Sequence, residues 1–345
     1  MEHNIFQIIW FVLWGVLWAG YFALDGFDLG AGILLPCVTR NEVERRAVYQ
    51  AIGPFWDGNE VWLITAGGAT FAAFPKTYAV MFSGLYTALY LLLFGLIIRG
   101  VAIEFRSKVQ DPGWRRFWDF LFWIGSLVST FILGVAFGNI FLGLPLDRNG
   151  HFLGSFFTLL HPYALLAGLL FVLVFSVHGA TWLVYRVNGE LRERLLRDAR
   201  ILWVFEAVVV VAFWLFSLKL TPLWHNYLRA PILLIFPLLA LGALLLVPYF
   251  LHQGRALAAF LSSGVTILGF TAWGMAGLFP NLFPSRLNPA WSLTIYNSSS
   301  SPLTLKIMTV VAFIFVPIVL LYTFWTYRTF SYRLTREEVT YGEGY

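Results

Sequence analysis

The chain has 345 residues, of which 59% are hydrophobic and 12% charged, and its formal net charge is +5. Its mean hydropathy is +0.75. Soluble domains carry about 25% charged residues, so the composition excludes a soluble protein and predicts an all-α, polytopic membrane bundle forming one transmembrane domain, residues 1–345. The single cysteine, Cys37, excludes a disulfide framework, a thiolate zinc site and an iron–sulfur cluster within the chain.

Nine apolar runs are long enough to be transmembrane helices, which need about 20 residues each. The second run contains two acidic residues and is the weakest, so eight helices with a re-entrant segment at 51–74 remain an alternative. The predicted spans are residues 5–37, 51–74, 78–103, 117–144, 157–185, 201–220, 231–251, 257–279 and 303–327.

The basic residues predict how the bundle is oriented. Most Lys and Arg residues fall in alternate loops, from Arg40, Arg45 and Arg46 after the first span to Arg328, Arg333 and Arg336 after the last. Under the positive-inside rule the N-terminus then lies outside and the C-terminus inside. Because these residues flank apolar spans, the positive charge indicates topology and not a nucleic-acid partner. Trp325 and Tyr327 fit an interfacial aromatic belt.

Two acidic pairs interrupt the first two spans. Asp25 and Asp28 lie in the motif LDGFDLGAG, and Asp57 and Glu60 lie in WDGNE. Each pair is separated by three positions and therefore shares a helix face. A carboxylate at the bilayer centre costs at least ~2.5 kcal/mol on insertion scales, so four of them require an explanation.

The depth of these acids indicates a path that opens inward. The first span reaches the inner surface near Arg40, which leaves Asp28 ~18 Å from that surface; the second begins near Tyr49, which leaves Asp57 ~12 Å above it. No Lys or Arg in these two spans neutralises the acids. Protonatable carboxylates around a polar cavity are typical of proton routes. The alternative is that they are neutral, hydrogen-bonded packing partners.

The histidines do not predict a haem or metal site. His161 and His178 lie on the same span, ~25 Å apart along the helix axis, so they cannot ligate one iron. The other histidines fall at the predicted membrane surfaces, and a lone histidine on an apolar helix is more often structural.

Several motifs resemble subunit II of the cytochrome bd-type quinol oxidases, including the cyanide-insensitive branch. The matching stretches include LDGFDLGAG, FWDGNEVWLITAGGATFAAFP, RGVAIEFRSK and NPAWSLTIYNSSSSPLTLKIM. The resemblance covers essentially the whole chain, and the DGFD and WDGNE blocks are its most specific parts.

The resemblance implies a multi-pass, haem-free subunit of the bacterial cytoplasmic (inner) membrane. It implies a larger partner, subunit I, that carries two haems b and one haem d. The complex would oxidise quinol and reduce oxygen to water, with protons taken from the inside. Small accessory subunits and a structural quinone are further expectations.

The resemblance also implies roles for individual residues. Asp25, Asp28, Asp57 and Glu60 are expected to form a cytoplasm-facing proton path, with Asp57 foremost because the WDGN motif centres on it. Trp56 and Arg99 resemble positions involved in assembly or in binding a quinone, and a structural role is the alternative for both. His178 stands where other members have an uncharged residue and receives no ligand role.

Two other functions compete with this interpretation. A proton-coupled secondary transporter would suit intramembrane acids and interrupted helices, but such folds show internal repeats, and the two halves of this chain show no self-similarity. A purely structural scaffold would use the acids as packing partners. Loss of oxygen consumption with retained haem in an Asp57→Asn variant would separate the proton path from the scaffold.

Overall fold

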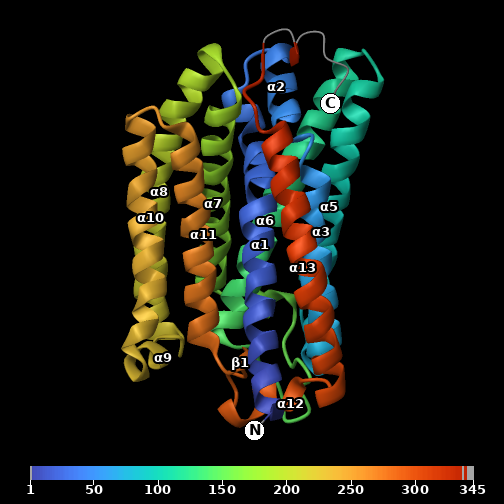
Figure 1. Ribbon diagram of the computed structural model, residues 1–345, viewed down its shortest axis with the longest axis vertical. Coiled ribbons are helices and arrows are strands. Elements are labelled where there is room, and N and C mark those ends of the chain that lie inside the picture. Colours follow the sequence, from blue (N-terminus) through green and yellow to red (C-terminus); the bar gives the residue numbers. More distant parts are fainter. Residues whose placement is uncertain (1, 336–337, 340–345) are drawn as a thin grey trace.

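The computed structural model describes residues 2–335 and 338–339, and Arg336 lies outside them. It is a bundle of long helices that run between two ends (Figure 1). The long helices are α1 (Glu2–Val38), α3 (Trp56–Ala73), α5 (Tyr86–Phe105), α6 (Pro112–Leu142), α7 (Pro162–Arg186), α8 (Gly189–Leu220), α10 (Ile235–His252), α11 (Ala256–Leu278) and α13 (Pro302–Phe330). Short elements cap both ends: α2 (Glu42–Ile52), α4 (Pro75–Gly84), α9 (Trp224–Arg229), β1 (Asn281–Phe283), β2 (Leu293–Thr294) and α12 (Ile295–Ser298).

Within the described part of the chain, eight helices are long and apolar enough to cross a membrane. They correspond to α1, α5, α6, α7, α8, α10, α11 and α13. The predicted span at 51–74 forms α3, an 18-residue helix that does not meet the same criterion. It starts near α2 and ends beside α12, where the Ser300 N–H donates to Ala73 O (2.8 Å). At ~1.5 Å per residue, α3 is about 27 Å long.

Helix α1 is central and packs against α3, α6, α7 and α11. Its crossing with α7 is close because glycines face each other there. A Cβ built on Gly30 would lie 1.8 Å from Phe175 O, and one on Gly179 would lie 2.6 Å from Ala31 N. Only glycine permits such an approach of two backbones. This contact fixes the part of α1 that carries the acidic motif.

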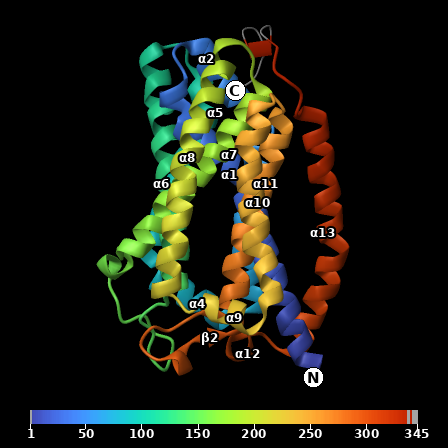
Figure 2. The same ribbon diagram turned by 90° about the vertical axis from the view of Figure 1, so that its left-hand side faces the viewer.

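Helix α13 lies at one side of the bundle (Figure 2), and only a small share of it is buried. Near its start, Trp10 Nε1 on α1 donates to Thr309 Oγ1 (3.0 Å). Beyond its end, the Leu334 N–H donates to Arg186 O (2.8 Å), and the Arg186 guanidinium donates to Phe330 O and Tyr332 O. The helix is therefore attached to the bundle mainly at its two ends.

The loops that follow α1, α5, α7, α10 and α13 lie at the same end of the bundle, next to α2 (Figure 1). The N-terminal end of α1 lies at the other end, together with α9, α12 and the antiparallel pair of β1 and β2. The loops predicted to be rich in Lys and Arg are therefore gathered on one side.

Candidate functional site

Asp25 on α1 and Arg99 on α5 form an ion pair in the interior of the bundle. Both side chains are 0% exposed. Arg99 Nη2 donates to Asp25 Oδ1 (2.7 Å) and Arg99 Nη1 donates to Oδ2 (3.2 Å), which is the bidentate geometry that makes arginine–carboxylate pairs strong. The first two predicted spans contain no cation, and α5, in the third predicted span, supplies one.

Glu60 on α3 is a second carboxylate beside the same guanidinium. Its Oε2 lies 3.5 Å from Arg99 Nη1, and its side chain is 21% exposed. When Asp25 and Glu60 are both ionised, the three groups carry an excess negative charge. The arrangement can therefore take up one proton without leaving an unpaired cation.

Asp28, one turn further along α1, is held by an amide. It is 0% exposed, and its Oδ2 accepts from Asn59 Nδ2 (2.7 Å), which also donates to Leu24 O (3.1 Å). Tyr327 on α13 donates from its hydroxyl to Asn59 Oδ1 (3.0 Å). The other oxygen of Asp28, Oδ1, is buried without a hydrogen-bond partner among the described residues.

Sequence reasoning missed Asn59 and Tyr327. Asn59 lies inside the WDGNE motif, so the motif was a usable signal. The interpretation of Tyr327 as a belt residue does not predict its contacts: its ring packs 4.6 Å, centroid to centroid, from that of Phe55 and 6.3 Å from that of Phe27, and its hydroxyl donates to Asn59. Hydropathy cannot distinguish the two situations, because both place a tyrosine near the end of a span.

Asp57 and Trp56 lie at the edge of this cluster. Asp57 is exposed on α3, away from the buried pair that Asp25 forms. Trp56 is partly buried beside α5, where a Cβ on Gly100 would lie 3.3 Å from its ring. Its Nε1 is buried with no hydrogen-bond partner in the described part of the chain. The structure thus brings Asp25, Asp28, Glu60 and Arg99 together and leaves Asp57 at the surface.

His178 on α7 is a buried structural residue and does not fit a haem ligand. Its Nε2 lies 2.9 Å from Ala23 O, an acceptor, so this nitrogen carries the proton; Nδ1 contacts Ser263 Oγ (2.6 Å). The ring stacks on Phe260 at 4.7 Å between centroids. Both nitrogens are engaged, so neither is free to bind iron. Among the residues that the structure describes, no group of three or more His, Cys, Asp and Glu could hold a metal ion.

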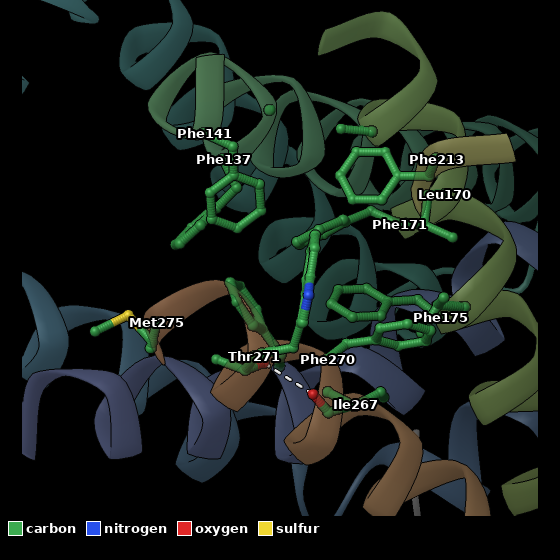
Figure 3. A pocket seen from close by; sticks show the side chains of 15 residues that line it. Phe137, Phe141, Leu170, Phe171, Phe175, Phe213, Ile267, Phe270, Thr271 and Met275 are labelled. Atoms are coloured by element: carbon green, nitrogen blue, oxygen red, sulfur yellow. Dashed lines mark hydrogen bonds between the residues drawn. The ribbon is translucent and has the colours of Figure 1, made fainter. Parts of the chain in front are cut away.

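Two apolar cavities lie apart from the charged cluster. One, of about 60 Å³, lies between α6, α7, α8 and α11, and aromatic rings such as Phe137, Phe171 and Phe270 surround it (Figure 3). The other, of about 570 Å³, lies between α1, α3, α4, α5 and α6. Trp56 and Arg99 line neither cavity, so the role of these two residues in quinone binding stays a prediction.

The fold and the site define a polytopic helical membrane protein with a buried network of carboxylates around one guanidinium. The model of the family "Cytochrome bd terminal oxidase subunit II" matches residues 6–330. The chain belongs to this family, and the predicted resemblance is confirmed.

Relatives of known identity match the chain along nearly its full length. A probable cytochrome oxidase subunit 2 of Haemophilus influenzae is 38% identical over 97% of this chain and 96% of its own. The cytochrome bd-I ubiquinol oxidase subunit 2 of Escherichia coli is 37% identical, over 98% of each chain. A chain of the bd oxidase structure from Geobacillus thermodenitrificans has the same fold, with a TM-score of 0.76 at 19% identity, covering 94% of this chain and 98% of that one. The relatives are thus subunits of an oxidoreductase complex.

Proposed function

We propose that this chain is the haem-free subunit of a quinol:oxygen oxidoreductase of the bacterial inner membrane. In this proposal it assembles with a haem-bearing subunit I and contributes a proton path that opens to the cytoplasm. Family membership supports the class of complex. The observation that carries the proton path is that Asp25 and Glu60 share the guanidinium of Arg99. Asp25 alone balances the charge of Arg99, so the ion pair does not require Glu60 as a second carboxylate.

We propose nine membrane crossings, with α3 as the ninth. The length of α3, about 27 Å, supports this, and so does its course between the two capped ends of the bundle. In addition, α1 begins at one end of the bundle and α13 finishes at the other (Figure 1), which requires an odd number of crossings. The basic loops near α2 support an inside location for that end.

In the proposed path, a proton passes from Glu60, which is partly exposed, to the carboxylates on α1. Arg99 Nη1 contacts both Asp25 (3.2 Å) and Glu60 (3.5 Å), so a proton on one of them leaves the cation paired to the other. Asn59 holds Asp28 next to this pair. Asp57 is exposed at a depth where lipid would disfavour it, which supports a partner covering this face of α3.

The haems and the quinol site are assigned to subunit I in this proposal. The engaged nitrogens of His178 support that assignment. The unpartnered Nε1 of Trp56 is the donor proposed for a structural quinone or for an oxygen of subunit I. Small accessory subunits remain a further expectation.

The test replaces single carboxylates in the purified complex. Glu60→Gln and Asp57→Asn are expected to lower oxygen consumption several-fold while the haem spectrum is retained. Glu193→Gln, which neutralises an exposed carboxylate on α8, is the matched control. Unchanged oxygen consumption in both variants would contradict the proton path, and loss of haem together with activity would favour a scaffold role.

A further inference from the structure

A groove of about 440 Å³ opens at the end of the bundle that carries the basic loops. Tyr185 on the last turn of α7, the first residues of α11 and Arg333, three residues beyond α13, line it. None of the acids of the proposed proton path lines this groove.

Two arginines give this groove its charge. Arg255 packs its guanidinium 5.1 Å from the centroid of the Phe250 ring, and Arg333 Nε donates to Tyr185 O at 3.5 Å. No ion pair joins either arginine to a carboxylate among the described residues, and none of the described Asp and Glu residues lines the groove. Arginine binds phosphate through paired N–H groups, so the groove is suited to a phosphate group.

The start of α11 adds to this preference. Its N-cap, Arg255, makes no side-chain capping bond, and the Ala256 N–H donates to Gly254 O (3.1 Å), which leaves the N–H groups of Leu257 and Ala258 available to an anion. The helix start would not define a site alone; the two arginines and the groove do so, and the helix end reinforces them.

An apolar stripe leads out of the groove along α11. Leu257, Leu261 and Leu268 are 45%, 57% and 42% exposed, and their spacings of four and seven residues place them on one helix face. Free phosphate has no use for such a stripe. A phospholipid uses both parts, because its phosphate lies at the membrane surface and its acyl chains run along the helix.

We propose that this groove binds an anionic phospholipid, with its phosphate between Arg255 and Arg333 and an acyl chain along Leu257, Leu261 and Leu268. Neither arginine pairs with a carboxylate of the described residues, which favours a lipid with net negative charge over a zwitterionic one, as in basic pockets at the ends of membrane helices. This site does not depend on the proton path.

The experiment measures lipid retention in the purified, delipidated complex by native mass spectrometry. The probes are phosphatidylglycerol, phosphatidylcholine and inorganic phosphate. Wild-type complex is expected to bind phosphatidylglycerol roughly tenfold more tightly than phosphatidylcholine. R255Q/R333Q is expected to lose that preference, whereas R229Q/R286Q, which removes two exposed arginines at the opposite end, is expected to keep it. Leu261→Asn is expected to weaken binding of the lipid and leave phosphate binding unchanged.

Three results would overturn the proposal. Equal retention of phosphatidylglycerol by wild type and R255Q/R333Q would show that the groove is not a lipid site. Binding of inorganic phosphate as tight as that of phosphatidylglycerol would show that the groove is a site for a small anion and not for a lipid. Release of the partner subunit from R255Q/R333Q, with lipid retention unchanged, would make the groove a subunit contact.

Discussion

Replacing Arg99 by Gln removes the guanidinium and leaves the Asp25 carboxylate buried without a cation. Because both side chains are 0% exposed, solvent does not screen the loss, and breaking such a pair costs about 3–5 kcal/mol. Asp25→Asn is expected to cost less, below about 3 kcal/mol, because Arg99 keeps Glu60 at 3.5 Å. The larger loss of stability expected for Arg99→Gln than for Asp25→Asn thus follows directly from the guanidinium that Asp25 and Glu60 share.

The assay is the temperature at which the purified complex loses its haem absorbance. At about 2 °C per kcal/mol for a large domain, Arg99→Gln should lower this temperature by about 6–10 °C, and Asp25→Asn by less. The double variant should be more stable than the sum of the two single effects predicts, since it leaves no uncompensated Asp25 charge. Equal midpoints for the two single variants, or strict additivity, would refute the reasoning.

Three smaller changes test the supporting contacts. Tyr327→Phe removes the donor to Asn59 and should cost about 1 kcal/mol of stability and lower oxygen consumption; wild-type activity would show that this bond does not position the acids. Asn59→Leu should lower oxygen consumption further, because it removes both the amide donor and the acceptor, and haem content reports whether the complex still assembles. Gly30→Ala should prevent assembly, since its Cβ would lie 1.8 Å from Phe175 O, whereas Gly242→Ala, with no atom within 4 Å of the added group, should assemble normally.

Hydropathy predicts most of this fold because a membrane helix is defined by the length and composition of a local segment. It does not predict the break in the third span, which the structure divides into α4 and α5 at Leu85. It is also least decisive for α3, whose polar residues lower the apolarity of an otherwise suitable segment. The α1–α7 crossing depends on Gly30 meeting a backbone carbonyl from another helix, which one segment alone cannot reveal.

In the candidate site, too, the sequence reveals what a local segment contains but not its partners on other helices. Carboxylates in apolar runs are conspicuous, so Asp25, Asp28 and Glu60 could be identified from the sequence. Their partners could not, because Arg99 is separated from Asp25 by 74 positions and Tyr327 from Asn59 by 268. An arginine near a predicted inner surface is interpreted as a topology residue until its ion pair with Asp25 on α1 is known. The exposure of Asp57 was likewise not predictable, since adjacent residues on α3 face different neighbours.

The number of acids relative to cations distinguishes a scaffold from a proton route. A scaffold needs one carboxylate to balance the charge of Arg99, and Asp25 already supplies it through two hydrogen bonds, of 2.7 and 3.2 Å. Glu60 adds a second, longer contact to the same guanidinium, and Asp28 adds a third carboxyl group, which the amide of Asn59 holds. Each addition costs desolvation that packing does not require. This surplus supports the proposed proton path, in which carboxyl groups bind and release protons beside a fixed cation.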